Sequence, residues 1–267
     1  MKTEELPAFF DGLEQWARRS DGTSELLAYG EHQDQVIELR RSSSPGVQPL
    51  ALVLHGGFWR AGYTRRNTTG LAVALAEAGW GWSSANVEYR RLGPGAYRPM
   101  LDDVAAARRV LEGFRPVVAV GHSAGGHLAL WLGAEGMVDA CVALGGVCDL
   151  GEAARAELGE RAVQELLGGS QDEVPEAYLV ADPGARLPLG VPQVLIHGVG
   201  DDRVPLSHPQ AYAARARAAG DDCRVVEIPG GHFEPIDPRS SIWQEVLGAM
   251  ASARAAVTGA AVSGATP

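Results

Sequence analysis

The segment from Arg115 to Gly133, RPVVAVGHSAGGHLALWLG, constrains the fold more than any other part of the chain. Pro116 to Val120 is a short β-branched apolar run, typical of a strand buried on both faces. The next five residues, Gly-His-Ser-Ala-Gly, lead directly into a helical pattern of apolar residues. Two glycines let the backbone turn sharply, so that Ser123 can sit on a strained turn with its hydroxyl above the edge of a sheet. The pattern predicts a strand, a tight turn and a helix, with Ser123 as a nucleophile.

The pentapeptide by itself is not specific. G-x-S-x-G occurs by chance in many chains, and a small strand-to-helix junction can simply allow close packing. The strand before the turn and the helix after it are the context that the chemistry requires. The free N–H groups at the start of that helix would also point at whatever Ser123 attacks. The context therefore favours a functional interpretation.

The rest of the chain alternates between buried strands and helices. Strands are expected at 26–29, 34–40, 50–54, 80–86, 116–120, 138–144, 191–196 and 223–228. Helices between most of them predict one mostly parallel, twisted eight-stranded sheet with helices on both faces. The 267 residues, 46% of them hydrophobic, are enough for a single α/β domain, which we place at residues 1–255.

Two segments depart from this alternation. Residues 146–190, between two central strands, contain only short helical patterns, and we expect a small lid there (the lid segment) that shapes the acyl or alcohol pocket. Residues 256–267 are rich in Ala, Gly, Ser and Thr and are expected to form a flexible tail.

Asp102 and Asp103 are expected near the start of a helix over 100–112, as capping or loop-anchoring groups.

Charge and composition exclude several classes of partner. The net charge is −10 and the basic residues are scattered, which argues against nucleic acid or an anionic membrane surface. The first residues lack a signal-peptide pattern, and no stretch approaches the roughly 18 apolar residues of a membrane span, so we expect a soluble, cytoplasmic protein. Cys141, Cys148 and Cys223 form no C-x-x-C and are interpreted as structural.

A second glycine-rich turn follows the strand at 50–54. There the chain reads His55-Gly56-Gly57-Phe58-Trp59, and two glycines after a buried strand allow backbone N–H groups to face a ligand. An ordinary βα loop would explain the same residues. The position favours the functional interpretation, because an acyl-transfer serine needs a second donor loop beside its own helix, and the loop after the third strand supplies it in this fold class.

A serine nucleophile also needs a general base and an acid. Only His232, among seven histidines, lies in a glycine-rich loop after the last strand and downstream of a suitable acid. His55 and His197 stand where strands become loops and are expected to hold those loops. Asp201 is preferred as the acid, while Asp202 remains an alternative that could instead pair with Arg203.

A metal site is not predicted. The chain has no H-E-x-x-H, and His122 and His127 are spaced i, i+5, which does not place them on one helical face. We therefore expect no metal and no cofactor.

At these residues the chain resembles the α/β-hydrolase superfamily, whose order of nucleophile, acid and histidine is that of Ser123, Asp201 and His232. HGGFW and GHSAGGHLAL look like the compact esterases of the hormone-sensitive-lipase type and, more closely, kynurenine formamidase (arylformamidase). The resemblance covers residues 50–233. It implies that the backbone N–H groups of Gly57, Phe58 and Ala124 form the oxyanion hole, with Phe58 where a third glycine often stands.

These patterns predict a cofactor-independent serine hydrolase that cleaves a small ester or an activated amide through an acyl-serine. We expect Trp59 and His122 to line the substrate pocket. Alternatives are an arylformamidase, a pathway-specific thioesterase or acyltransferase, and a non-catalytic receptor on the same scaffold, although receptors of that kind usually lack a triad member. The partner would be a small molecule, and a homodimer is left open.

Overall fold

The computed structural model describes residues 1–20 and 22–258, and within them eight strands form one sheet in the order β1-β2-β4-β3-β5-β6-β7-β8. β1 and β2 pair antiparallel, as do β2 and β4, and the other neighbours are parallel. The strands are β1 (Glu25–Ala28), β2 (Val36–Arg40), β3 (Leu50–Leu54), β4 (Ser83–Val87), β5 (Val117–His122), β6 (Ala140–Leu144), β7 (Gln193–Gly198) and β8 (Cys223–Ile228). The predicted mostly parallel sheet is confirmed.

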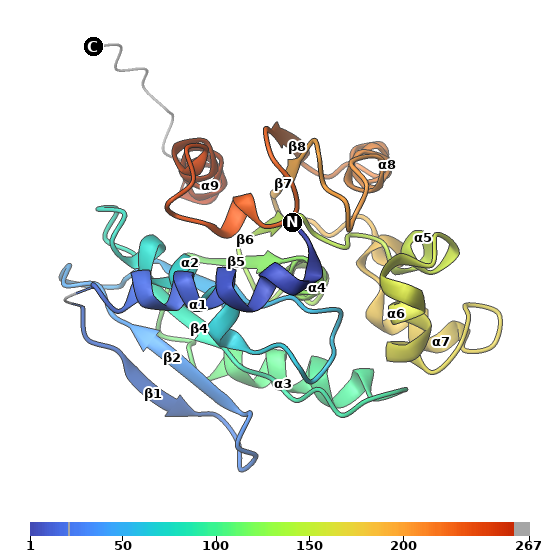
Figure 1. The fold of residues 1–267 in the computed structure, drawn as a ribbon, viewed down its shortest axis with the longest axis horizontal. Coiled ribbons are helices and arrows are strands. Elements are labelled where there is room, and N and C mark those ends of the chain that lie inside the picture. Colours follow the sequence, from blue (N-terminus) through green and yellow to red (C-terminus); the bar gives the residue numbers. More distant parts are fainter. Residues whose placement is uncertain (21, 259–267) are drawn as a thin grey trace.

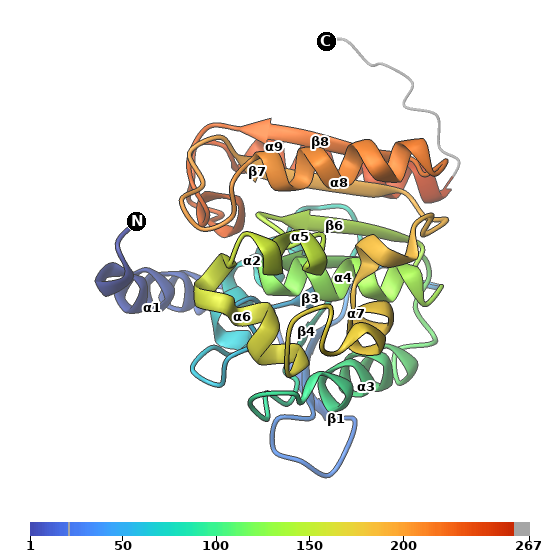
Figure 2. The same cartoon turned by 90° about the vertical axis from the view of Figure 1, so that its right-hand side faces the viewer.

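Helices cover both faces of the sheet. One apolar core lies between the sheet and α1 (Leu6–Ala17), α2 (Thr69–Ala76) and α9 (Trp243–Thr258). The other lies under α3 (Tyr97–Arg109), α4 (Ala124–Ala134), α8 (Ser207–Ala218) and the lid segment. Figure 1 shows α1 lying along α2, and Figure 2 shows α3, α4 and α8 together on the opposite side. Burial of the central strands on both faces explains their continuous apolar sequences.

The register brings the ends of the central strands to one edge. Leu54 at the end of β3 pairs with Gly121 of β5, and His122 pairs with Leu144 at the end of β6. The segments that follow β3 and β5 therefore leave the sheet side by side. This is the edge where reactive groups gather in a parallel sheet.

The lid segment lies between β6 and β7. It contains α5 (Leu150–Arg155), α6 (Leu158–Leu167), α7 (Pro175–Ala181) and a short 3₁₀ helix at Pro183–Arg186. In Figure 2 these elements, in yellow tones, lie beside α3 and α4. Trp131 of α4 donates a hydrogen bond from its indole nitrogen to the carbonyl oxygen of Val180 over 3.0 Å. The segment is thus tied to the helix that follows Ser123.

The helices differ in detail from the sequence pattern. In α2, all residues from Gly70 to Leu75 are buried, because α1 covers its outer side. α3 begins at Tyr97 rather than near residue 100, so Asp103 lies inside the helix, and it anchors the loop after β4 by accepting the backbone N–H of Arg90, in line with the expected loop-anchoring role. α9 extends to Thr258 and includes the first residues of the expected tail. Residues 259–267 of that tail lie outside the described residues.

Candidate active site

The turn at Ser123 is strained and depends on its glycines. Ser123 has φ 55° and ψ −117°, a conformation that non-glycine residues rarely adopt. A Cβ atom on Gly121 would lie 1.9 Å from the carbonyl oxygen of Gly125, and one on Gly125 would lie 2.1 Å from that of Leu54. Only glycine fits at these two positions. The backbone N–H of Ser123 donates to the carbonyl oxygen of Leu144 over 2.9 Å, which ties the turn to β6.

The structure brings Asp201 and His232 together. Oδ2 of Asp201 lies 2.7 Å from Nδ1 of His232, and both side chains are buried. Oδ1 of Asp201 accepts the backbone N–H groups of Arg203 and Val204, at 2.8 and 2.9 Å. The carboxylate is therefore fixed by its own loop, and it holds the proton of the imidazole on Nδ1. That leaves Nε2 of His232 as the free nitrogen.

Asp201 remains ionised in this environment. Burial alone would raise its pKa, but the hydrogen bond and charge of His232, together with the N–H groups of Val204 and Arg203, outweigh burial and lower the pKa of Asp201 below its usual value. Asp202 is different: its side chain is 57% exposed and lies 3.5 Å from Nε of Arg203. Of the two candidate acids, only Asp201 contacts His232.

His122 supports the backbone of His232. Its Nε2 donates to the carbonyl oxygen of His232 over 2.9 Å, and the two rings lie 4.7 Å apart. Burial, with the electrostatic effect of the neighbouring His232 as the next contribution, lowers the pKa of His122 to about 3, so its ring is neutral. His122 also lines the cavity at Ser123, as expected. The support for His232 was missed because it needs two loops separated by more than 100 residues.

Ser123 and His232 line one narrow cavity of about 30 Å³. Among the described residues, the hydroxyl of Ser123 makes no hydrogen bond to a protein group. The wall also includes Gly57 and Phe58 of the loop after β3, together with Leu6 and Phe10 of α1. The N-terminal helix therefore forms part of the wall of this cavity.

The loop after β3 has an unusual backbone. Phe58 and Trp59 have φ of 49° and 58°, in the left-handed region. In the described part of the chain, the backbone N–H groups of Gly57, Phe58 and Ala124 donate to no protein acceptor. Three donors near one small cavity are the arrangement that a developing oxyanion requires.

Trp59 does not line the cavity at Ser123 and lines a neighbouring cavity instead. It is 5% exposed, and its indole N–H donates to Nδ1 of His127 over 3.2 Å. Nε2 of His127 in turn donates to the carbonyl oxygen of Ala181 over 2.8 Å. Burial lowers the pKa of His127 to about 4, so the ring is neutral and accepts from Trp59. The pair joins the loop after β3, α4 and the lid segment.

Two larger cavities adjoin the site. One, of about 370 Å³, lies between Phe58, Trp59 and the α6 residues Glu165 and Leu166. The other, of about 610 Å³, runs along α1 and shares Leu6, Phe10, Tyr63 and Asn67 with the cavity at Ser123. The lid segment therefore lines the first neighbouring cavity, whereas α1 covers Ser123 itself.

Other candidate chemistry is not supported. Within residues 1–20 and 22–258, no group of three or more His, Cys, Asp or Glu side chains could hold a metal ion. The three cysteines are buried and unpaired, consistent with a structural role. In the same part of the chain, no helix has both the length and the apolar character needed to cross a membrane.

Comparisons with known proteins agree with this geometry. Residues 102–245, just over half of the chain, match the sequence model of the prolyl oligopeptidase family. Esterase B from Lactobacillus rhamnosis superposes with a TM-score of 0.75 at 19% identity, covering 96% of both chains. Thermogutta terrifontis esterase 2 superposes with a TM-score of 0.70 at 19% identity, covering 91% of this chain and 95% of that one.

A truncated carbohydrate esterase from gut microbiota gives a TM-score of 0.70 at 17% identity, covering 87% of this chain and 96% of that one. No curated protein sequence matches the chain significantly. The structural similarities confirm the predicted α/β-hydrolase fold.

Proposed function

The chain belongs to the prolyl oligopeptidase family, and from that premise we propose that it is a serine hydrolase that cleaves short-chain carboxylic esters. The observation that carries the proposal is the hydrogen-bonded pair of Asp201 and His232, in which His232 lines the same narrow cavity as Ser123. A neutral imidazole with its second nitrogen free, beside a serine on a strained turn, is the arrangement used for acyl transfer.

The proposed reaction uses only groups of this chain and water. His232 takes the proton of Ser123 while Oγ attacks the carbonyl carbon of the ester. The negative charge that develops on the carbonyl oxygen is stabilised by the N–H groups of Gly57, Phe58 and Ala124. His232 then gives the proton to the leaving alcohol, and an acyl-serine forms. Water, deprotonated by His232, releases the acid and regenerates Ser123.

The size of the cavity supports a short acyl group. The cavity at Ser123, of about 30 Å³, is far smaller than the neighbouring cavities of about 370 and 610 Å³. The larger cavity along α1 is contiguous with it and offers room for the alcohol part. Thermogutta terrifontis esterase 2, which shares the fold, has been solved with propionate bound. We therefore assign the small cavity to the acyl group and the α1 cavity to the alcohol.

A second candidate is arylformamide hydrolysis. Formyl is the smallest acyl group, so the narrow cavity suits it as well as acetyl. The aromatic leaving group would then occupy the α1 cavity, where Phe10 and Tyr63 offer ring surfaces. A thioester with a short acyl group would use the same groups, and peptide hydrolysis is the activity that the family name suggests.

One substrate panel separates these possibilities. Turnover is measured with p-nitrophenyl acetate, butyrate and octanoate, acetyl-coenzyme A, N-formylkynurenine and a prolyl p-nitroanilide. We expect kcat/KM to be highest for acetate and to fall by at least tenfold at octanoate. A preference for N-formylkynurenine, for the thioester or for the anilide would replace the ester assignment by the corresponding one.

The nucleophile is tested separately. A fluorophosphonate probe should label the wild-type protein at Ser123, and Ser123→Ala should remove both labelling and turnover while leaving Tm nearly unchanged. Unlabelled but folded wild-type protein, without turnover on any substrate of the panel, would instead favour a ligand-binding protein on this scaffold.

A further inference from the structure

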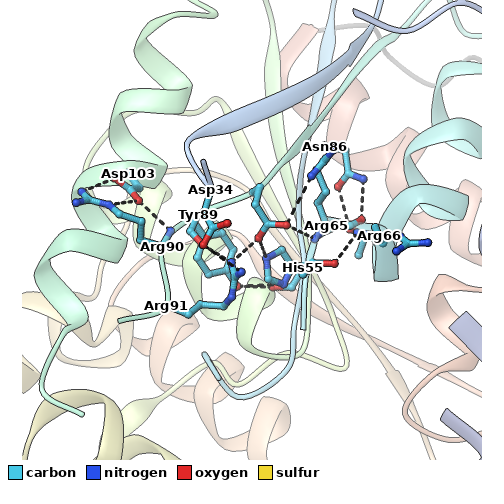
Figure 3. Close-up of polar contacts among 12 residues, drawn as sticks. Asp34, His55, Arg65, Arg66, Asn86, Tyr89, Arg90, Arg91 and Asp103 are labelled. Carbon is cyan, nitrogen blue, oxygen red and sulfur yellow. Dashed lines mark hydrogen bonds and ion pairs between the residues drawn. The ribbon is translucent and has the colours of Figure 1, made fainter. Parts of the chain in front are cut away.

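A buried carboxylate lies beneath the loop after β3. Glu88 directly follows β4, is 3% exposed, and accepts hydrogen bonds from three directions. Its Oε1 lies 3.0 Å from Nε2 of His55 and also accepts from the guanidinium of Arg91. Its Oε2 accepts the backbone N–H of Arg65 over 2.9 Å. Figure 3 shows His55, Arg65 and Arg91 close to one another.

Both ring nitrogens of His55 face acceptors. Nδ1 lies 2.9 Å from the carbonyl oxygen of Gly56, which can only accept, and Nε2 faces the carboxylate of Glu88. A neutral imidazole has one N–H and could satisfy only one of these contacts. His55 is fully buried, so an acceptor that faces a ring nitrogen without a proton would cost free energy.

Glu88 is the partner that is ionised. A proton on its carboxyl group would point at a donor, because its oxygens already face the N–H of Arg65 and the guanidinium of Arg91. Burial alone would raise the pKa of Glu88, but His55, the N–H of Arg65 and the charge of Arg91 outweigh burial and lower it. The ionised carboxylate therefore favours an N–H on the ring nitrogen that faces it.

We propose that Glu88 is a positioning residue of the oxyanion hole, which holds His55 as an imidazolium and thereby fixes the carbonyl group of Gly56. Fixing that carbonyl sets the direction of the peptide that carries the N–H of Gly57. The next two residues, Phe58 and Trp59, are in the left-handed region, which is strained for residues other than glycine and persists only where the surroundings hold it. The proposal rests on the proposed serine hydrolase.

Tyr89, two arginines and Asp34 also surround His55 and Glu88. Tyr89 stacks on the ring with centroids 4.3 Å apart, and its hydroxyl donates to the carbonyl oxygen of His55 over 2.8 Å. The guanidinium of Arg65 lies 3.8 Å from Oε2 of Glu88, and Arg91 also pairs with Asp34 over 3.6 Å. Glu88 thus stands between His55 and two arginines, with Asp34 behind Arg91.

The test compares Glu88→Gln with a matched variant, Asp103→Asn. Asp103 belongs to the same region, is 1% exposed and binds Arg90 and Gln35 (Figure 3 shows it beside Arg90). With p-nitrophenyl acetate, we expect Glu88→Gln to lower kcat by about 10–100-fold with KM within about threefold, because only transition-state stabilisation is affected. Asp103→Asn should lower Tm but leave kcat within about twofold.

An oxyanion-specific readout separates positioning from simple destabilisation. A phenyl trifluoromethyl ketone forms a hemiketal oxyanion with a serine, so its affinity for Glu88→Gln should fall by about the same factor as kcat. Labelling by a fluorophosphonate gives the fraction of folded protein. Equal losses of kcat in the two variants, or an unchanged ketone affinity in Glu88→Gln, would overturn the proposal.

The protonation state is tested in the wild-type protein, so it does not depend on whether a variant folds. Nitrogen-15 NMR of histidine-labelled protein, with the His55 signals assigned from His55→Gln, should show protons on both ring nitrogens at pH 7. A neutral ring would contradict the inference. If the wild-type protein itself is neither labelled nor active, the proposed function fails. The NMR measurement would still test the protonation of His55 independently.

Discussion

Oδ2 of Asp201 lies 2.7 Å from Nδ1 of His232, although 31 residues separate them in the chain. The two residues leave the ends of β7 and β8, which are parallel neighbours, so their loops meet at one edge of the sheet. Ser123 reaches the same edge from β5, which is separated from β7 by β6 in the sheet order. A short contact between distant residues is thus a consequence of parallel strand order.

The two adjacent aspartates offer a matched test of this contact. Asp201→Asn should lower kcat by about 10⁴-fold, because an amide no longer holds the proton of His232 on Nδ1 or stabilises the imidazolium. Asp202→Asn should remain within about twofold of wild type, since that side chain is exposed and does not contact His232. Steady-state kinetics with p-nitrophenyl acetate measures both. Similar losses in the two variants would rule out the assignment of Asp201.

His122 should act on catalysis through the backbone of His232. His122→Phe removes the hydrogen bond to the carbonyl oxygen of His232 and should lower kcat by about tenfold. His122→Gln, whose amide N–H can donate a similar bond, should recover most of it. Because the pKa of His122 is lowered to about 3, its ring signals in NMR should not titrate between pH 5 and 8. A titration in that range would show that the ring is not buried as described.

Trp59 should prove structural. Trp59→Phe removes the indole donor to His127 and leaves a gap, which together should cost about 2–3 kcal/mol of unfolding free energy. The KM for aryl esters should change by less than about twofold, since Trp59 does not line the cavity at Ser123. Trp80→Phe, at a partly exposed site, is the control and should cost less than 1 kcal/mol. A large change in KM in Trp59→Phe but not in Trp80→Phe would show that Trp59 contributes to substrate binding.

Asp182 should make stability depend on pH. Burial, with the negative charge of Asp149 as the next contribution, raises its pKa from 3.8 to about 6. Between these values the folded protein binds more protons than the unfolded chain, so unfolding free energy rises as pH falls from 7 towards 4. The contribution of this group is at most about 3 kcal/mol and is constant below pH 3.8.

Urea unfolding at pH 7 and pH 5 measures this effect by difference. The unfolding free energy of the wild type should exceed that of Asp182→Asn by more at pH 5 than at pH 7, because only the wild type carries the titrating group. Asp172→Asn, in the same lid segment but exposed, should show the same difference from wild type at both pH values. If the difference in unfolding free energy between the wild type and Asp182→Asn did not change with pH, the raised pKa of Asp182 would be contradicted.

Local patterns were sufficient for the features that depend on neighbouring residues. The elbow at Ser123 follows from two glycines with no room for a Cβ atom, between an apolar strand and a helix. The alternation of apolar runs and helical patterns predicted the mostly parallel sheet. Since strands of such a sheet end at one edge, the approximate meeting of Ser123, Asp201 and His232 could also be predicted.

The sequence by itself therefore determined the sheet, the elbow and the set of groups that leave its carboxyl edge, because these depend on short-range periodicity and steric limits. Tertiary structure decided what surrounds that edge. Trp59 turned towards His127, α1 rather than the lid segment covered Ser123, and Glu88 after β4 bound His55 after the neighbouring β3. Such contacts depend on how distant segments fill shared space and satisfy buried polar groups, and neither spacing nor composition carries that information.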